Sequence, residues 1–340
     1  MHSAKNYSIK EVILWTRRDI YVHFLIAFGV TFLFSILKWK WIAIPWLPIA
    51  MMGTAVAFVV GFKNNASYDR LWEARRIWGA IVNASRSWGI MVQDYITNQH
   101  AKNPASDKEL LQMQRRLIDR HLAWLTALRY QLREPRIWES RHQVHNIEYR
   151  NRTYVVDEHT VPIDAAIADF VDEKECAFIK NKTNKAAQIL ALQSKNLRQL
   201  LEAGFIEDFR HMEMERVIVE LYNQQGASER IKNFPYPRQF ATLNLYFIKV
   251  FVILIPFGML QEFDKLGEHL IWLNIPFSVL SAWIFTTMEK IGEVTESPFE
   301  GSANDVPISA MSRGIEIDLK EMFNYDVIPE PVKPVNNILL

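Results

Sequence analysis

Three side chains of the second apolar run are spaced so that they could act together. Thr54, Phe58 and Phe62 are four residues apart, and this spacing places them on one face of an α-helix. One hydroxyl and two rings along a helix at membrane depth could line a narrow pore. The same stripe could equally pack against a neighbouring helix, so the spacing alone leaves both interpretations open.

The chain lacks a residue constellation typical of catalysis. Its single cysteine, Cys176, rules out an intrachain disulfide framework and a cysteine-based zinc site, and the acids beside it in DEKECAFIK do not favour a reactive thiolate. HMEMER, residues 211–216, has one histidine and two glutamates without the HExxH spacing, and the few scattered glycines form no phosphate loop. We therefore expect no enzyme, no bound metal and no cofactor.

Acids near the carboxyl end are the remaining candidates for a metal site. They are Glu293, Glu296, Glu300 and Asp305. Calcium takes about six to eight oxygens, usually from clustered carboxylates and carbonyls. Here the acids are spread out and diluted by residues 301–303, so the pattern favours a solvated polar turn that follows a helix.

The distribution of apolar residues indicates what positions these side chains. Hydrophobic residues make up 49% and charged residues 23% of the 340 residues, as in a soluble protein. That average hides four apolar runs, two towards each end of the chain, with a polar block between them. The net charge of +1 gives no basic field, so no nucleic-acid partner is expected.

The four runs predict two transmembrane hairpins, because each is close to the roughly 20 residues that cross a hydrocarbon core. The expected spans are residues 20–37, 42–62, 240–260 and 269–288. They form hairpins over residues 20–62 and 240–288, and residues 1–19 precede them as an amphipathic segment. Lys249 interrupts the third span. A lysine at such depth faces protein or water, or reaches for the interface, and its role stays open.

The polar block, residues 63–239, predicts a helical bundle. The second span continues without an evident break into an amphipathic helix that reaches Tyr95. Further helices are expected between Ser106 and Pro135, over 163–201 with Gly204 ending it, and over 206–222, whereas 135–165 is irregular. No segment alternates as a strand would. Residues 289–340 are expected to hold one more amphipathic helix and an extended, proline-rich tail.

Positive charges predict the orientation. They flank the polar side of the first two spans as Lys5, Lys10, Arg17, Arg18, Lys63, Arg70, Arg75 and Arg76. The outer turns carry fewer lysines, so both termini and the polar block should be cytoplasmic. The expected location is the cell inner (plasma) membrane, with multiple passes. Four spans make a small bundle, and a homo-oligomer around a central axis would supply a conduit.

Three blocks of the sequence resemble bacterial bestrophins. They are GFKNNASYDRLWEARRIWG, ERIKNFPYP and GEVTESPFEGSANDVPISAMSRGIEIDLKEM, at residues 61–79, 229–237 and 292–322. They occur in the right order, and the pattern of spans fits up to about residue 325. The resemblance implies an all-α fold with four transmembrane helices per subunit and a cytosolic helical bundle, assembled as a pentamer with a central pore.

The resemblance also implies roles for particular residues. Thr54, Phe58 and Phe62 match the narrow hydrophobic neck, although the family usually has an apolar residue where Thr54 stands. Arg210 falls near the cytosolic aperture, where the family usually has an aliphatic residue, and a ring of arginines there would favour anions. Only Glu300 and Asp305 remain of the run of acids that forms a calcium clasp in animal members, so calcium activation is not expected.

The function that follows is a homopentameric channel that conducts small ions passively, chloride or other monovalent anions in the first instance. Its partners would be other copies of the chain, the lipid bilayer and the permeating ions. A channel permeable to monovalent cations is an alternative within the same family. A non-conducting membrane scaffold or sensor is the alternative from another class. Ion selectivity, the gating stimulus and the physiological role stay open at this point.

Overall fold

The computed structural model describes residues 1–340 and is helical throughout. Its β-type contacts are isolated bridges near the two chain ends, His2 with Ile338 and Val335 with Ile338. Four helical stretches are long and apolar enough to cross a membrane: Ile9–Ser35, Lys40–Tyr95, Arg238–Asp264 and Leu270–Thr295. The predictions of an all-α fold and of four spans in a multi-pass membrane protein are confirmed.

The α-helices, in chain order, are α1 Ile9–Ser35, α2 Trp46–Tyr95, α3 Asp107–Arg133, α4 Val144–Thr153, α5 Ile163–Ala168, α6 Glu173–Lys180, α7 Lys185–Ala203, α8 Asp208–Asn233, α9 Arg238–Asp264, α10 Asn274–Thr295 and α11 Ile308–Met322. Short 3₁₀ turns lie at Lys40–Ile42, Ser140–His142, Asp157–His159 and Leu270–Leu273.

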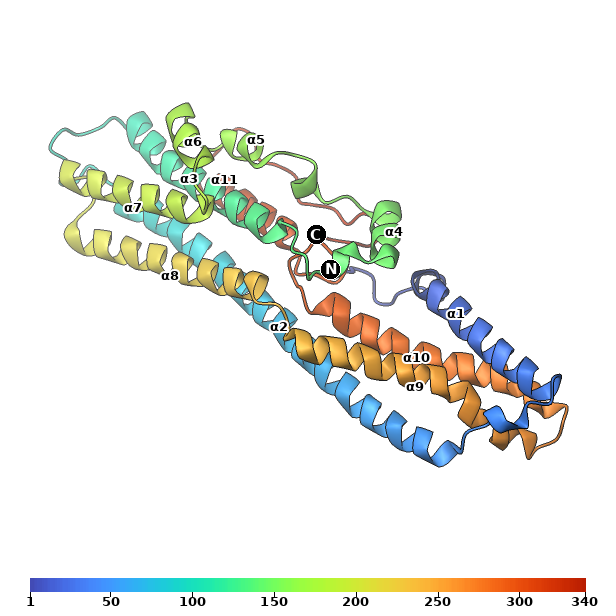
Figure 1. Ribbon diagram of the computed structural model, residues 1–340. Helices are drawn as coiled ribbons and strands as arrows, with labels where there is room; N and C mark the ends of the chain where they lie inside the picture. The colour runs from blue at the N-terminus through green and yellow to red at the C-terminus, as the bar shows by residue number, and fades with distance from the viewer.

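Helix α2 joins the two halves of the molecule. The membrane half consists of α1, α9, α10 and the first half of α2, and the polar half consists of the second half of α2 and the remaining helices. Helix α2 has 50 residues, which at about 1.5 Å per residue gives a rod of about 75 Å. Its first half packs with α9 and α10, and α1 covers those two helices. Its second half packs with α3, α8 and α11 (Figure 1). The second span therefore continues into the polar block without a break, as its sequence predicts.

Capping residues set several of the helix ends. Ser8 and Glu11 form a capping box at the start of α1, and Ser106 and Glu109 form another at the start of α3. Gly204 ends α7 in the left-handed conformation, with φ of +84°, and a Cβ there would lie 2.2 Å from the His100 carbonyl oxygen. Glycine is required at this turn for both reasons.

The polar block is more divided than its sequence indicates. The single helix expected over 163–201 is wrong, because α5, α6 and α7 replace it. Asp172 and Asn184 cause the division: each side chain accepts a hydrogen bond from a backbone N–H three residues later and so starts a new helix. Helix α4 lies in the segment expected to be irregular, and α8 continues past residue 222 to Asn233.

The ends of the membrane helices also differ from expectation. Helix α1 begins at Ile9 and runs through residues 19 and 20 without interruption, so the amphipathic segment and the first span are one element. Helix α9 extends the third span at both ends, and α10 begins at Asn274 and continues beyond residue 288. In each case the helix continues into polar sequence because its backbone hydrogen bonds do not depend on the bilayer.

The two halves bury their apolar side chains differently. A cluster of 35 buried residues forms the core of the polar half, whereas the clusters of the membrane half have eight and five residues. The membrane helices instead expose large apolar side chains, including Phe24, Leu25 and Phe28. This is the arrangement expected where lipid covers the outer surface. Inside the membrane half, the Asn274 side chain donates to Thr31 and to the Pro256 carbonyl, joining α1, α9 and α10.

Candidate pore lining

The stripe of α2 lies on the face that its neighbours leave uncovered. Phe58 is 65% exposed and Phe62 is 70% exposed in the single chain, and Thr54 is exposed too. On the opposite face of the same turns, Val56 and Val60 are buried against α9. The two rings therefore take no part in the core of their own subunit.

Close contacts fix the rotation of α2. A Cβ added at Gly53 would lie 2.7 Å from the ring of Phe251 on α9, and one at Gly258 would lie 2.5 Å from Cδ1 of Ile49. Because the backbones of α2 and α9 approach through these glycines, α2 cannot turn its stripe inward without moving α9. The exposure of Phe58 and Phe62 is thus set by packing on the other side of the helix.

Thr54 uses its hydroxyl proton within the helix. Its Oγ1 donates to the Ala50 carbonyl oxygen at 3.1 Å, a common arrangement for threonine in a helix. What the side chain presents outward is therefore a methyl group and an acceptor oxygen. The site can be wetted more readily than a leucine or isoleucine position, and its acceptor would interact more favourably with a cation than with an anion.

A buried ion pair lies directly beyond the stripe. Lys63 Nζ contacts Glu289 Oε1 of α10, and both side chains are almost fully buried. The positive charge of Lys63, which follows Phe62 in sequence, is therefore neutralised inside the subunit. The pair fastens α2 to α10 at the end of the membrane half, and Lys63 contributes no free charge to the stripe.

Arg210, the residue predicted near the cytosolic aperture, is held by its own subunit. Its Nε lies 3.5 Å from Glu207 Oε2, and its guanidinium lies 5.6 Å from the centre of the Tyr95 ring. The neighbouring Phe209, in the first turn of α8, is 84% exposed. Phe209 is the residue that sequence reasoning missed. An apolar side chain at the second position of a polar helix, two residues after the N-cap Glu207, was the signal.

The acids near the carboxyl end do not form a solvated turn, and that expectation is wrong. Glu300 is 1% exposed and Asp305 is 2% exposed. Ser140 Oγ donates to Glu300 at 2.6 Å, and Arg133 Nη1 donates to Asp305 at 3.1 Å. The segment after α10 folds inward because α3 and the residues after it supply these hydrogen-bond donors.

Burial raises the pKa of Glu300 well above its ordinary value, and the negative charge of Asp305 raises that pKa further. The folded protein therefore holds a proton on Glu300 at pH values where the unfolded chain has lost it. Stability attributable to this group is present at low pH and falls as pH rises from the ordinary pKa through the raised one.

Glu300→Gln is expected to remove this pH-dependent loss, because the amide stays neutral. The measurement is the midpoint of thermal unfolding in detergent between pH 4 and 9, the range that brackets ordinary carboxyl titration and its rise on burial. The unfolding midpoint of the variant should fall less steeply with rising pH than that of the wild type. The exposed Glu330→Gln is the control and should follow the wild-type curve. Parallel curves for all three proteins would contradict the account.

The other chemistry-bearing groups are structural. Cys176 packs against the large core cluster, and His211 lies 3.6 Å from Glu215 on the same helix. The structure contains no group of three or more histidine, cysteine, aspartate or glutamate side chains arranged to hold a metal ion.

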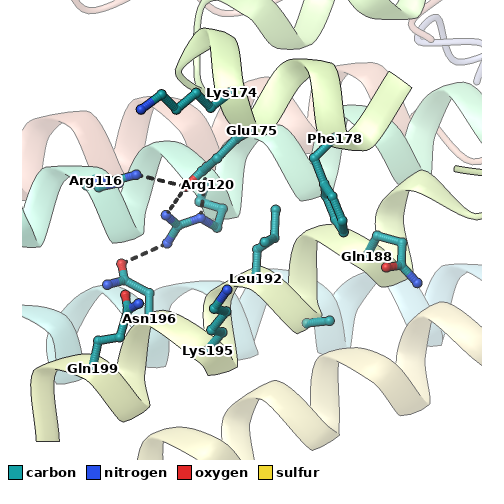
Figure 2. A pocket seen from close by; sticks show the side chains of 11 residues that line it. Arg116, Arg120, Lys174, Glu175, Phe178, Gln188, Leu192, Lys195, Asn196 and Gln199 are labelled. Atoms are coloured by element: carbon teal, nitrogen blue, oxygen red, sulfur yellow. Dashed lines mark hydrogen bonds and ion pairs between the residues drawn. The ribbon is translucent and has the colours of Figure 1, made fainter. Parts of the chain in front are cut away.

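A cavity of about 470 Å³ between α3, α6 and α7 is lined mainly by polar side chains. Figure 2 shows the Arg116 and Arg120 side chains directed towards Glu175, with Asn196 beside Arg120. Arg120 is buried and also donates to Gln193 at 2.9 Å. The ion pairs fasten α6 to α3, and the hydrogen bonds from Arg120 to Gln193 and Asn196 fasten α7 to α3. These contacts lie on helices other than α2.

Comparison with known proteins agrees with this architecture. Residues 8–321 match the family described as bacterial/fungal bestrophin protein. A voltage-dependent anion channel-forming protein of Ralstonia nicotianae is 28% identical over 285 residues, which are 84% of this chain and 78% of that protein. One of the same description from Escherichia coli K12 is 24% identical over 313 residues, which are 92% and 88% of the two chains. The crystal structure of a bacterial bestrophin homolog from Klebsiella pneumoniae shares the fold, with a TM-score of 0.75, 22% identity and coverage of 92% and 99%.

Proposed function

This chain belongs to the bacterial and fungal bestrophin family, and we propose that five copies of it form a passive channel for monovalent anions. The observation that carries the proposal is the outward stripe of Phe58 and Phe62 on α2. Copies of the same helix around a shared axis would cover these two large rings and place them along a common path. The relatives described as voltage-dependent anion channel-forming proteins support anions as the permeating class.

In this proposal, α2 lines the path and the neck consists of rings of Thr54, Phe58 and Phe62. Permeation needs no chemistry beyond wetting: the neck conducts when water fills it and closes when it dewets or narrows. The edges of phenylalanine rings carry partial positive charge, so rings presented edge-on would tolerate an anion. The acceptor oxygen of Thr54 is the feature that favours the cation-permeable alternative.

The proposed orientation places the polar half and both termini in the cytoplasm, below the inner membrane. The two chain ends lie close together near the junction of the halves (Figure 1). Ser3 N donates to the Asn337 carbonyl oxygen, and Arg17 of α1 pairs with Glu148 of α4 at 2.8 Å. These contacts support an arrangement with both termini on the side of the polar half. The positive charges favour the cytoplasm as that side.

Purified protein in planar bilayers tests the proposed function. Under a potassium chloride gradient, the reversal potential should approach the equilibrium potential of chloride. A reversal potential near that of potassium would favour the cation alternative. The absence of any current, with a monomeric mass in solution, would favour a non-conducting scaffold.

A second constriction is proposed at the start of α8, where Phe209 is exposed. Phe209→Ala should increase current severalfold. A constriction lined by alanine methyl groups is wider and less apolar than one lined by phenylalanine rings, so water fills it more easily. Arg210→Ala should leave the reversal potential unchanged, since Glu207 and Tyr95 already hold the guanidinium. The predicted ring of Arg210 around the axis remains a prediction. A shift towards cation permeability in Arg210→Ala would support that ring and count against Phe209.

A further inference from the structure

A crevice of about 320 Å³ lies between α1 and α9, with α10 at its base. Its walls are mainly apolar and include Val22 and Ile26 of α1 and Leu245, Val252 and Ile253 of α9. We propose that it binds an anionic phospholipid of the cytoplasmic leaflet, with Lys249 contacting the lipid phosphate and an acyl chain lying along the apolar walls. This assigns a role to the lysine that interrupts the third span.

The charges around the crevice leave one cation unneutralised. Lys290 pairs with Asp19, and Glu289 pairs with Lys63. Lys249 is exposed and has no ion-pair or hydrogen-bond partner in the subunit, although all the other charged side chains of the crevice do. An unpaired lysine in a membrane helix needs a counter-charge or water. A lipid phosphate would supply that charge.

The direction of the crevice fits a lipid that enters from the cytoplasmic side. Along α1 the lining runs from Asp19 to Ile26, and along α9 it runs from Leu245 to Ile253. Lys249 is eleven residues after Arg238 and thus about 16 Å along α9, and it lines the same crevice as Asp19 and Lys290. Asp19 and Lys290 therefore mark the end of the crevice nearer the polar half, Ile26 and Ile253 mark its deeper end, and Lys249 lies between them.

The apolar walls decide between a lipid and a free anion. A soluble phosphate would gain nothing from Val22, Ile26 or Val252, whereas an acyl chain would bury surface against all three. Helix α1 packs on α9 and α10, and the proposed neck lies on a different helix, α2. Lipid binding at Lys249 is therefore separate from ion permeation. A test of one can fail without affecting the other.

Native mass spectrometry of the detergent-purified protein tests the inference. The protein is titrated with dioleoyl-phosphatidylglycerol or with dioleoyl-phosphatidylcholine. The wild type should bind phosphatidylglycerol about fivefold more tightly, the preference expected for one lysine facing an anionic headgroup. Lys249→Gln should lose that preference, and Lys249→Arg should keep it. Lys265→Gln removes a charge from the opposite end of α9, where Lys265 pairs with Glu262 at 2.8 Å, and should also keep it.

Ile253→Trp provides a second variant that leaves the charge intact. The indole would fill the crevice, so binding of both lipids at this site should fall together. Retention of the phosphatidylglycerol preference in Lys249→Gln would overturn the proposal, as would equal binding of the two lipids to the wild type. If inorganic phosphate displaced bound phosphatidylglycerol as strongly as added phosphatidylglycerol does, the site would bind a free anion. That result would also overturn the proposal.

Discussion

Replacing Phe58 by alanine is expected to raise the ion flux through the reconstituted protein by about tenfold. In the proposed pentamer, Phe58 contributes one ring from each subunit to the narrowest part of the neck. Removing the rings widens and hydrates this region, and a reduction of the permeation barrier by about 1.4 kcal/mol corresponds to a tenfold rate. Anion flux from liposomes, at equal protein density, measures the effect.

Phe28→Ala is the matched control for Phe58→Ala. Phe28 is also an exposed phenylalanine of the membrane half, but it lies on α1, which packs against α9 and α10. The control should conduct like the wild type because its side chain faces away from the proposed path. Equal flux in the wild type and both variants would show that the α2 stripe does not limit permeation.

The largest loss of stability is expected from Arg133→Met. The Arg133 guanidinium donates to Asp305 at 3.1 Å and lies 3.9 Å from Glu158, and all three side chains are almost fully buried. Without the arginine, Asp305 loses its cationic partner inside the protein. Breaking a buried ion pair from one side costs about 3–5 kcal/mol. The midpoint of thermal unfolding in detergent at neutral pH should fall clearly.

Arg136→Met makes the same substitution three residues later, where the arginine pairs with the exposed Glu134 at 3.3 Å. Pairs at the surface contribute about 0–1 kcal/mol, so this variant should unfold close to the wild type. If the two variants lost the same stability, the buried cluster would not be the contact that holds the segment after α10 against α3.

The parts of the fold that follow from local chemistry were predictable from the sequence. The apolar runs predict the four spans, Ser106 predicts the start of α3, and Gly204 predicts the end of α7. Each depends on residues adjacent in the chain, which is why the sequence carries the information. The continuous α2 belongs to the same class, because no residue between Phe62 and Tyr95 interrupts the helical pattern.

The features that sequence reasoning missed depend on contacts between distant segments. Glu300 and Asp305 were expected to be solvated, because their hydrogen-bond partners, Ser140 and Arg133, are more than a hundred residues away in the sequence. Phe209 was not singled out from the sequence, because its exposure depends on how α8 packs against its neighbours. The division of residues 163–201 into three helices lies between these two cases. Asp172 and Asn184 are local signals, but a few polar residues in a helical pattern can mark either a helix cap or a solvated helix face.

Thiol accessibility at position 58 tests the central claim that the α2 stripe lines a shared path. The chain has one cysteine, so Cys176→Ser supplies a background free of thiols, into which Phe58→Cys is introduced. Currents are recorded in planar bilayers before and after addition of a charged, membrane-impermeant methanethiosulfonate reagent. The account predicts that the reagent abolishes the current of Phe58→Cys and leaves the Cys176→Ser background unaffected. An unchanged current, with mass spectrometry showing complete labelling of the introduced thiol, would contradict it.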